Sequence, residues 1–355
     1  MNKKIKVAVV GGSGFTGIEL IKILSLHKHV EIKFVTSRTY KNMKVSEAFP
    51  SYSDYRNNKL TFVEKIGKEE LKMIDVLFLC LPPLESMQYL KKNISNYDGK
   101  IIDIGSDFRI NNPDNYKKWY KAEHMLPDLL PDFVYGLTEI YRDKIKQSKY
   151  IANPGCYPTS ILLGIAPILK NKDININSIV IDSKSGISGA GRKLKPEYLF
   201  CSLNDNFYAY SAAAHRHIGE MEQEIEKISG KKYSICFTPH LLPVNRGIFT
   251  SIYCMLDCPV KSNNLVKSIC KIYDEVYKDS CFIKFLGEKL PQLKDVISTN
   301  MCHIGLRWDS RTSTLKVFTA IDNLIKGAAG QAVQNMNIMM GINETEGLDV
   351  SGIFS

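Results

Sequence analysis

Cys156 stands on a turn that gives its thiol the features of a catalytic nucleophile. The turn spans residues 153–160, with the sequence NPGCYPTS, and an apolar helical stretch follows over 161–169. The positive end of a helix macrodipole favours thiolate over thiol, and thiolate is the nucleophilic form. Pro154, Gly155 and Pro158 restrict the backbone around it. We therefore expect Cys156 to be a nucleophile, against the alternative of a buried structural cysteine.

Two histidines flank an arginine at the start of a second predicted helix. His215, Arg216 and His217 precede apolar side chains at helical spacing, at Ile218, Met221, Ile225 and Ile228. The positive helix end disfavours imidazolium, so a histidine there is neutral and able to accept a proton, although Glu220 acts in the opposite direction. A lone histidine is more often structural, but this cluster indicates a functional role beside the thiol, without distinguishing the two rings.

A second glycine-rich loop and two arginines offer places for an anionic substrate. The loop runs over 185–193, after a strand predicted over 179–182. Its glycines allow the backbone to lie close to a ligand, and a merely flexible loop is the alternative. Arg109 and Arg246 occur among glycines and prolines, where each is either a clamp for an anion or an ordinary salt-bridge arginine.

The sequence GGSGFTG at residues 11–17 joins the first predicted strand, 4–10, to a predicted helix over 18–26. At such a junction the pyrophosphate of a dinucleotide rests on the helix N-terminus, and glycines permit its close approach to the backbone. We therefore expect nucleotide binding rather than an ordinary turn, through Gly11, Ser13, Gly14, Phe15, Thr16 and Gly17.

The end of the second predicted strand, 31–37, distinguishes two nicotinamide cofactors. NAD-binding sites place an acidic residue there to bind the ribose 2′-hydroxyl. This chain has Ser37 and Arg38 instead, and a hydroxyl with a guanidinium suits a 2′-phosphate. We therefore predict NADP(H) as the cofactor, with NAD as the alternative if Arg38 is simply a solvent-facing strand end.

Strands and helices alternate along the first part of the chain. Helical segments separate the first two strands from strands predicted over 75–81 and 100–104. Such alternation implies right-handed crossovers and a parallel sheet. We expect an N-terminal Rossmann-type domain over 1–152, in an α/β chain.

The pattern of predicted elements changes after residue 152, because the strands there are longer and are joined in pairs by turns. The strands predicted over 301–308 and 315–321 form a hairpin, and those over 234–237 and 249–256 flank a proline-containing segment. We expect an α+β catalytic and oligomerisation domain with a mixed, largely antiparallel sheet over 153–325. The last segment, 326–355, is expected to pack back onto the first domain.

Composition excludes several classes of protein. The chain has 355 residues, of which 44% are hydrophobic and 24% charged, as in soluble globular proteins, and no apolar run approaches the ~20 residues of a membrane span. Its nine cysteines show neither a CxxC pair nor metal-ligand spacing, so we expect a reduced cytoplasmic protein without a metal. The net charge of +10 comes from scattered basic residues, which favours an anionic small substrate over nucleic acid.

Taken in order, these segments resemble the family of N-acetyl-γ-glutamyl-phosphate reductases, relatives of aspartate-semialdehyde dehydrogenase. The resemblance runs over nearly the whole length and rests on residues 11–17, 106–109, 153–159, 185–192, 215–217, 237–247 and 320–327. Two positions depart from the family pattern, because Gly219 and Thr138 stand where the family usually or commonly has proline.

The resemblance implies a mechanism and assigns roles. Cys156 attacks an acyl phosphate to form a thioester, NADPH reduces the thioester to a semialdehyde, and His215 is the base, with His217 as the alternative. Substrate-binding residues implied by the family motifs are Arg109, Asn153, Ser185, Gly186, Arg192 and Arg216. The family also implies a homodimer or homotetramer built through the second domain, in arginine biosynthesis.

Two rival interpretations remain at this stage. One is a reductase of a related acyl phosphate, either aspartyl phosphate or an aminoadipyl phosphate on a carrier protein, because the loops over 185–193 and 243–247 do not reveal the length of the substrate. The other is a non-catalytic NADP-binding sensor, which predicts cofactor binding without a reactive thiol. A nucleic-acid binder is a more distant third.

Overall fold

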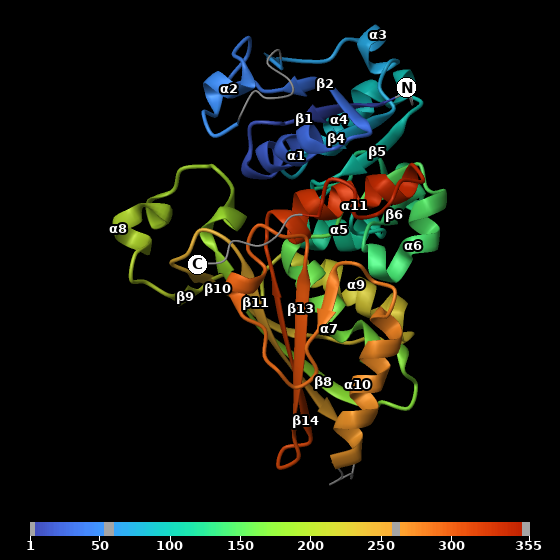
Figure 1. Ribbon diagram of the computed structural model, residues 1–355, viewed down its shortest axis with the longest axis vertical. Helices are drawn as coiled ribbons and strands as arrows, with labels where there is room; N and C mark the ends of the chain where they lie inside the picture. Colours follow the sequence, from blue (N-terminus) through green and yellow to red (C-terminus); the bar gives the residue numbers. More distant parts are fainter. Residues whose placement is uncertain (1–3, 53–59, 258–262, 350–355) are drawn as a thin grey trace. The chain divides into compact units, whose positions relative to one another are not determined.

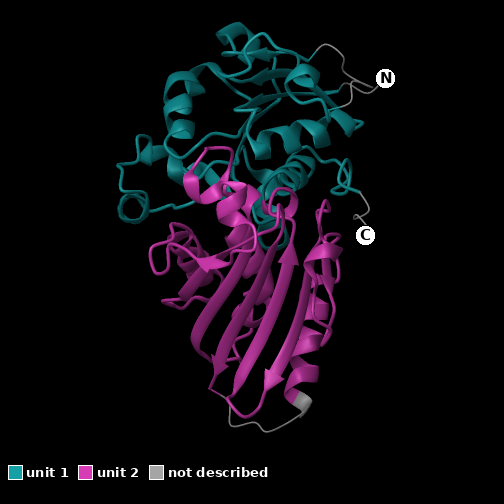
Figure 2. Cartoon of the chain, turned by 90° about the vertical axis from the view of Figure 1, so that its left-hand side faces the viewer, with its two compact units in different colours: residues 1–154, 328–349 teal, residues 155–327, 350–355 magenta. Residues whose placement is uncertain are grey.

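The computed structural model describes residues 4–52, 60–257 and 263–349, and the chain divides into two compact units (Figure 2). Unit 1 comprises the residues up to 154 together with 328–349, and unit 2 comprises residues 155–327. The domain limits expected from the sequence were 1–152 with 326–355, and 153–325. The last six residues of that terminal segment, 350–355, lie outside the described residues.

Unit 1 contains a seven-stranded sheet in which every neighbouring pair is parallel, in the order β3-β2-β1-β4-β5-β7-β6. Central strands carry continuous apolar runs because helices cover both faces, and Val7, Ala8 and Val9 are fully buried. The parallel sheet predicted from the sequence is confirmed. The strands are β1 Ile5–Val10, β2 Val30–Thr36, β3 Phe62–Val63, β4 Val76–Leu79, β5 Lys100–Asp103, β6 Phe133–Tyr135 and β7 Tyr150–Ala152.

The helices of unit 1 include one from the end of the chain, α11 Gly330–Met339, which contacts α1 and α6 (Figure 1). Thr138 begins α6, where the family commonly has proline, and its buried Oγ1 donates to Asn335 Oδ1 (2.7 Å) and accepts from Gln331 Nε2 (2.5 Å). This departure therefore ties α6 to α11. The other helices are α1 Phe15–Leu26, α2 Val45–Ala48, α3 Lys68–Leu71, α4 Glu85–Asn93, α5 Pro113–Tyr120 and α6 Thr138–Gln147.

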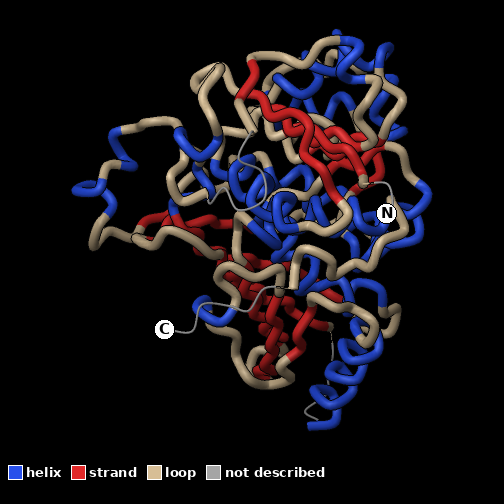
Figure 3. The backbone as a smooth tube through the Cα atoms, turned by 45° about the horizontal axis from the view of Figure 1, so that its top comes forward, coloured by secondary structure: helices blue, strands red, loops and turns tan. Residues whose placement is uncertain are grey.

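Unit 2 is built on a mixed, largely antiparallel sheet of seven strands in the order β12-β13-β14-β11-β8-β10-β9, as predicted. Among the described strands of this sheet, only the pairs β8–β10 and β12–β13 are parallel. The long strands of this sheet lie side by side in Figure 2, and Figure 3 draws the strands of both units in red. The strands are β8 Ile176–Gly186, β9 Tyr208–Ala209, β10 Cys236–Leu242, β11 Ile248–Leu256, β12 Ile283–Phe285, β13 Cys302–Asp309 and β14 Thr314–Ile321.

Helix α7, Cys156–Lys170, packs on β11 and β14 and positions the nucleophile. Ser160 Oγ lies between Thr250 Oγ1 (3.0 Å) and Thr319 Oγ1 (2.7 Å), so the helix is bonded to two strands. Gly164 permits this closeness, since a Cβ there would lie 2.8 Å from Thr319 Cγ2. The remaining helices of unit 2 are α8 Phe200–Leu203, α9 His217–Ser229 and α10 Asn263–Tyr277, with short 3₁₀ turns at Ile187–Ala190, Pro196–Tyr198 and Leu293–Asp295.

Two strands of unit 2, β10 and β8, extend at least three residues beyond their predicted limits, whereas most other predicted strand ends differ by one or two residues. The segment with Pro239 was expected to lie between strands, but Pro239 is inside β10, opposite Ser183 of β8. On its other side β10 pairs only with the two-residue edge strand β9. There the Pro239 carbonyl accepts the N–H of Tyr210 (3.0 Å), a bond that does not require an N–H on the proline. β8, predicted over 179–182, spans Ile176–Gly186, because it pairs with β11 from Ile176 to Ser185 and with β10 as far as Gly186.

Candidate active site

Cys156 is the first residue of α7, and Gly155 is its N-cap in an extended conformation (φ −67°, ψ 155°). The N-cap supplies no side-chain bond and the first turn holds no acidic residue, so α7 itself does not cap the N–H groups of its first turn. Cys156 itself is half-buried. Gly327 passes directly beside it, and a Cβ at residue 327 would lie 2.9 Å from the Cys156 Cβ.

A buried carboxylate fixes the turn before the nucleophile. Glu220 lies in the first turn of α9 with no exposed surface, and its Oε1 accepts a hydrogen bond from Gly155 N (2.8 Å). This bond joins residues 65 positions apart and links the starts of α7 and α9, which also pack along their lengths. Glu220 thereby holds the backbone that carries Cys156.

His215 stands in an aromatic enclosure at the start of α9. Its ring centroid lies 5.5 Å from Tyr157, 5.9 Å from Tyr210, 5.6 Å from Phe237 and 4.7 Å from His217. This burial, reinforced by the charge of Arg216, lowers the pKa of His215 to about 4, so the ring is neutral at pH 7. His215 Nδ1 accepts the backbone N–H of His217 (3.2 Å), which orients the ring at the helix start.

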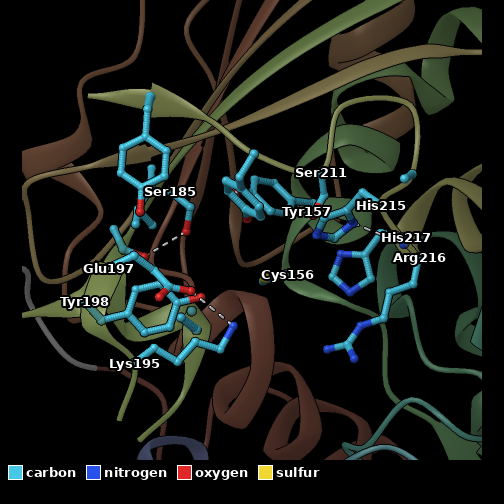
Figure 4. Close-up of a pocket in the computed structure, with 17 residues that line it drawn as sticks. Cys156, Tyr157, Ser185, Lys195, Glu197, Tyr198, Ser211, His215, Arg216 and His217 are labelled. Atoms are coloured by element: carbon cyan, nitrogen blue, oxygen red, sulfur yellow. Dashed lines mark hydrogen bonds and ion pairs between the residues drawn. The ribbon is translucent and has the colours of Figure 1, made fainter. Parts of the chain in front are cut away.

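A cavity of about 520 Å³ in unit 2 gathers these groups (Figure 4). That volume is within the usual range for small-molecule sites. Of the residues predicted to act in the site, it brings together Cys156, Ser185, Gly186, His215, Arg216 and His217. The exposed Arg192 is not among the lining residues. The cavity is also lined by residues that the sequence analysis did not single out, among them Tyr157, Lys195, Glu197, Tyr198, Tyr208 and Tyr210.

The segment over 185–191 is held by backbone bonds at its start, so the alternative of a flexible loop fails there. Gly186 N donates to Gly247 O (2.9 Å) and Ile187 N to Val244 O (2.9 Å). A Cβ on Gly186 would lie 2.7 Å from Arg246 N, so glycine is required for this close approach. The two loops proposed to choose the substrate are therefore one packed structure.

Two arginines make internal bonds. Arg246 Nε lies 3.5 Å from the fully buried carboxylate of Asp322. This pairing fits the salt-bridge role that the sequence analysis gave as one alternative for Arg246. Arg109 belongs to unit 1, is 7% exposed, and donates to Asn153 O (2.7 Å) and Ile104 O (2.9 Å). Asn153, also buried in unit 1, donates to Ala328 O (3.1 Å) and accepts from Asn335 Nδ2 (3.1 Å). The bonds of Arg109 and Asn153 organise the end of β7 in unit 1.

The glycine-rich loop of unit 1 has the shape of a phosphate cradle. Gly11 has a φ of +82°, and a Cβ on Gly17 would lie 2.6 Å from Gly11 O, so both residues must be glycine for internal reasons. Gly14, the N-cap of α1, differs because the only described atom near its ideal Cβ is Gly11 O, at 3.9 Å. Space is open there beside an uncapped helix N-terminus, which fits a dinucleotide pyrophosphate.

The residues after β2 continue this site. Ser37 is buried and its Oγ donates to Ser13 Oγ (2.9 Å), which joins the strand end to the glycine loop. The side chain of Arg38 is 83% exposed and pairs with Glu85 at 3.2 Å. The end of β2 thus carries a hydroxyl and an exposed guanidinium.

Within the described residues, no three histidine, cysteine or acidic side chains are grouped so as to hold a metal ion. None of the helices in the described part of the chain is long and apolar enough to cross a membrane.

Comparison with protein families places the chain in a class. Residues 6–148 match the family described as semialdehyde dehydrogenase, NAD binding domain, and residues 156–323 match semialdehyde dehydrogenase, dimerisation domain. The chain therefore belongs to the semialdehyde dehydrogenase family, as the resemblance predicted. Unit 1 provides the NAD(P)-binding domain of that class.

Individual relatives narrow this further. The chain is 45% identical over 351 residues to N-acetyl-gamma-glutamyl-phosphate reductase of Thermoanaerobacter sp. (strain X514), covering 99% of both chains. It is 46% identical over 350 residues to the enzyme of the same name from Caldicellulosiruptor saccharolyticus, covering 98% of this chain and 99% of the relative. Within the semialdehyde dehydrogenases, the chain thus falls among the N-acetyl-gamma-glutamyl-phosphate reductases.

Solved structures agree on the fold. Aspartate semialdehyde dehydrogenase II of Vibrio cholerae, complexed with ASA, superposes with a TM-score of 0.70 at 17% identity, covering 96% of this chain and 99% of that one. Aspartate semialdehyde dehydrogenase of Candida albicans, solved with NADP, gives a TM-score of 0.67 at 18% identity, covering 96% and 100%.

Proposed function

We propose that the protein reduces N-acetyl-γ-glutamyl phosphate to N-acetylglutamate semialdehyde and phosphate, as a step of arginine biosynthesis. The observation that carries the proposal is the cavity in which Cys156, at the N-terminus of α7, meets the neutral, half-buried His215 and the cation of Arg216. Identity of about 45% along the whole chain to enzymes of that name supports the substrate.

Cys156 is the proposed nucleophile. Its thiolate attacks the γ-carbonyl carbon, forming a C–S bond, and the C–O bond to phosphate breaks with the electron pair leaving on phosphate. The N-terminus of α7 stabilises the thiolate, and Glu220 holds the turn so that the sulfur keeps its position. Arg216 lines the same cavity and is the proposed partner of the leaving phosphate.

His215 is the proposed proton carrier. Its lowered pKa leaves the ring neutral, and Nδ1 carries no hydrogen because it accepts the His217 N–H. Nδ1 takes the proton of the Cys156 thiol and releases the His217 N–H as it does so. When the thiohemiacetal collapses, the C–S bond breaks, the thiolate is restored and the hydroxyl proton leaves as the aldehyde forms. His217, in ring contact with His215 and also lining the cavity, is the alternative carrier.

NADPH is the proposed cofactor, and when bound it supplies the hydride that reduces the thioester. Gly11, Ser13, Gly14, Phe15, Thr16 and Gly17 are the residues proposed to hold its pyrophosphate. Ser37 and Arg38 are proposed to bind the 2′-phosphate, since no acidic residue directly follows β2. The match to a dimerisation domain supports a homodimer or homotetramer.

A comparison of two aldehyde substrates tests the proposal. The enzyme is assayed in the reverse direction, with phosphate and NADP⁺, on N-acetylglutamate semialdehyde and, separately, on aspartate semialdehyde. We expect a kcat/KM at least about 100-fold higher for the N-acetylated aldehyde. A kcat/KM for aspartate semialdehyde equal to or above that value would overturn the substrate assignment in favour of a related acyl phosphate.

A further inference from the structure

The cavity holds two fixed positive charges, and they lie at different places in it. Among its lining residues, only Arg216 and Lys195 are cations whose charge does not depend on pH near neutrality. Figure 4 shows Arg216 grouped with His215 and His217, whereas Lys195 is grouped with Glu197 and Tyr198 on the other side of the labelled Cys156. A substrate with two anionic groups therefore meets a separate cation for each.

Arg216 belongs to the reacting end of the cavity. It precedes α9, whose Glu220 holds Gly155, and its charge acts on the neighbouring His215. The phosphate of an acyl phosphate is one bond from the carbonyl carbon that Cys156 attacks, so it must lie at this end. Lys195 is then left for a charge at the far end of the substrate.

The local structure presents Lys195 in a defined way. Pro196 follows it and favours the extended backbone that it adopts (φ −144°, ψ 144°), and Lys195 O accepts Tyr198 N (3.0 Å) in the 3₁₀ turn. Its Nζ lies 5.1 Å from the centre of the Tyr198 ring and 3.5 Å from Glu197 Oε1. A cation held over an aromatic ring beside a half-exposed carboxylate can exchange that carboxylate for one on a ligand.

We propose that Lys195 binds the α-carboxylate of the substrate and selects an N-acylated amino acid over one with a free amine; this rests on the proposed function. Acetylation removes the positive charge of the α-amino group, so the amino-acid end of the substrate is a net anion that attracts an ammonium. An aspartyl compound presents an α-ammonium at that end, which the Lys195 ammonium repels.

The test compares two aldehydes in the reverse reaction, N-acetylglutamate semialdehyde and 4-acetamidobutanal, which is the same molecule without its α-carboxylate. The wild-type enzyme should prefer the carboxylated aldehyde by about 10- to 100-fold in kcat/KM, the range for a hydrogen bond to a charged group. In Lys195→Gln this preference should fall to within about threefold, while the rate with 4-acetamidobutanal stays within about twofold of wild type.

Two further variants serve as controls. Lys195→Arg keeps the charge and should retain most of the preference, whereas Lys193→Gln, which removes an exposed charge that does not line the cavity, should leave it intact. A preference that persists in Lys195→Gln overturns the assignment, as does a loss of equal size with both aldehydes. A wild-type enzyme that favours aspartate semialdehyde would overturn the proposed function instead, and this inference with it.

Discussion

Helix α1 of unit 1 and helix α7 of unit 2 begin in nearly the same way. Each has a glycine N-cap in extended conformation, Gly14 at φ −72° and ψ 166° and Gly155 at φ −67° and ψ 155°. Neither N-cap residue has a side chain that could cap its own helix, and neither first turn contains an acidic residue. Most helices gain stability from such a cap, so both positions forgo it and keep a positive helix end available.

The surroundings of the two helix starts differ. Beside Gly14 there is open space, and the crowded glycines Gly11 and Gly17 bring strand and helix together beneath it. At α7 the first helical residue supplies a thiol, and Glu220 occupies the Gly155 N–H. The comparison teaches that an uncapped helix start becomes a ligand site or a nucleophile site according to the residue that follows the cap and the groups packed on it.

Among the substitutions beside Cys156, replacing the proposed proton carrier His215 should lower turnover the most. We predict that His215→Asn lowers turnover by about 10²- to 10⁴-fold while the Kd for NADPH barely changes, because the change is confined to unit 2. Stopped-flow rates and fluorescence titration of NADPH check the two parts. His217→Asn is the matched variant in the same cavity, and a greater loss of turnover there would transfer the role to His217.

The pH dependence sharpens this assignment. Burial lowers the pKa of His215 from 6.5 to about 4, so the neutral form persists as pH falls below 6.5 and is lost only near pH 4. The acidic limb that His215 contributes to kcat/KM should therefore lie near pH 4 and disappear in His215→Asn. A limb near pH 6.5 that the substitution abolishes would contradict the enclosed, desolvated ring.

The bond that closes the α7 turn is tested by comparing two substitutions of Glu220. Alanine leaves the buried Gly155 N–H without an acceptor, which should destabilise unit 2 by about 1–3 kcal/mol, whereas glutamine retains an acceptor oxygen and should cost less. Thermal unfolding monitored by circular dichroism measures the difference. If Glu220→Ala and Glu220→Gln lower Tm equally, the hydrogen bond to Gly155 is not what stabilises the turn.

The open space at α1 is tested by filling it. Gly14→Ala adds a methyl group where the protein itself has room, so Tm should change little while the Kd for NADPH rises by about tenfold. Calorimetric titration gives the Kd. Alkylation of Cys156 is the control and should keep its wild-type rate. Unchanged NADPH affinity would show that the cofactor does not approach Gly14.

The smallest effect is expected at Arg38. Its side chain is exposed and its guanidinium forms an ion pair with Glu85. Arg38→Ala should therefore reduce the preference for NADPH over NADH by only about two- to fivefold. The ratio of kcat/KM values for the two cofactors measures it. Arg142→Ala, which removes a cation paired with Glu344 elsewhere in unit 1, is the control. A ratio that does not change would remove Arg38 from the cofactor site.

Local sequence was sufficient for the features that depend on neighbours in the chain. The junction of β1 and α1 and the hairpin of β13 and β14 follow from turn residues and hydrophobic spacing. The helix predicted over 161–169 is also present, but α7 begins five residues earlier, at Cys156, so the predicted turn over 153–160 is helical from Cys156 onward. The family resemblance and both sheet types were also confirmed, because alternating and paired strands leave different patterns.

Features set by distant residues were missed. No local pattern reveals that Glu220 reaches Gly155, or that β9 is short enough at the sheet edge to tolerate Pro239 in β10. The substrate-binding role predicted for Arg109 and Asn153 stays a prediction, and no local pattern revealed their bonds to backbone and to Asn335 within unit 1. Lys195 and the tyrosines at 198, 208 and 210 cluster in the sequence soon after the second glycine-rich loop, and that clustering could have marked them as site residues. Only the structure shows that they line the same cavity as Cys156.

The central claim is that Cys156 carries the acyl group between phosphate and hydride. Intact-mass analysis after mixing the enzyme with N-acetyl-γ-glutamyl phosphate, without NADPH, tests it directly. We predict a mass increase of one N-acetylglutamyl group that maps to Cys156, disappears on addition of NADPH and does not form in Cys156→Ser. An unmodified enzyme, together with a Cys156→Ser variant that retains full reductase activity, would contradict the account.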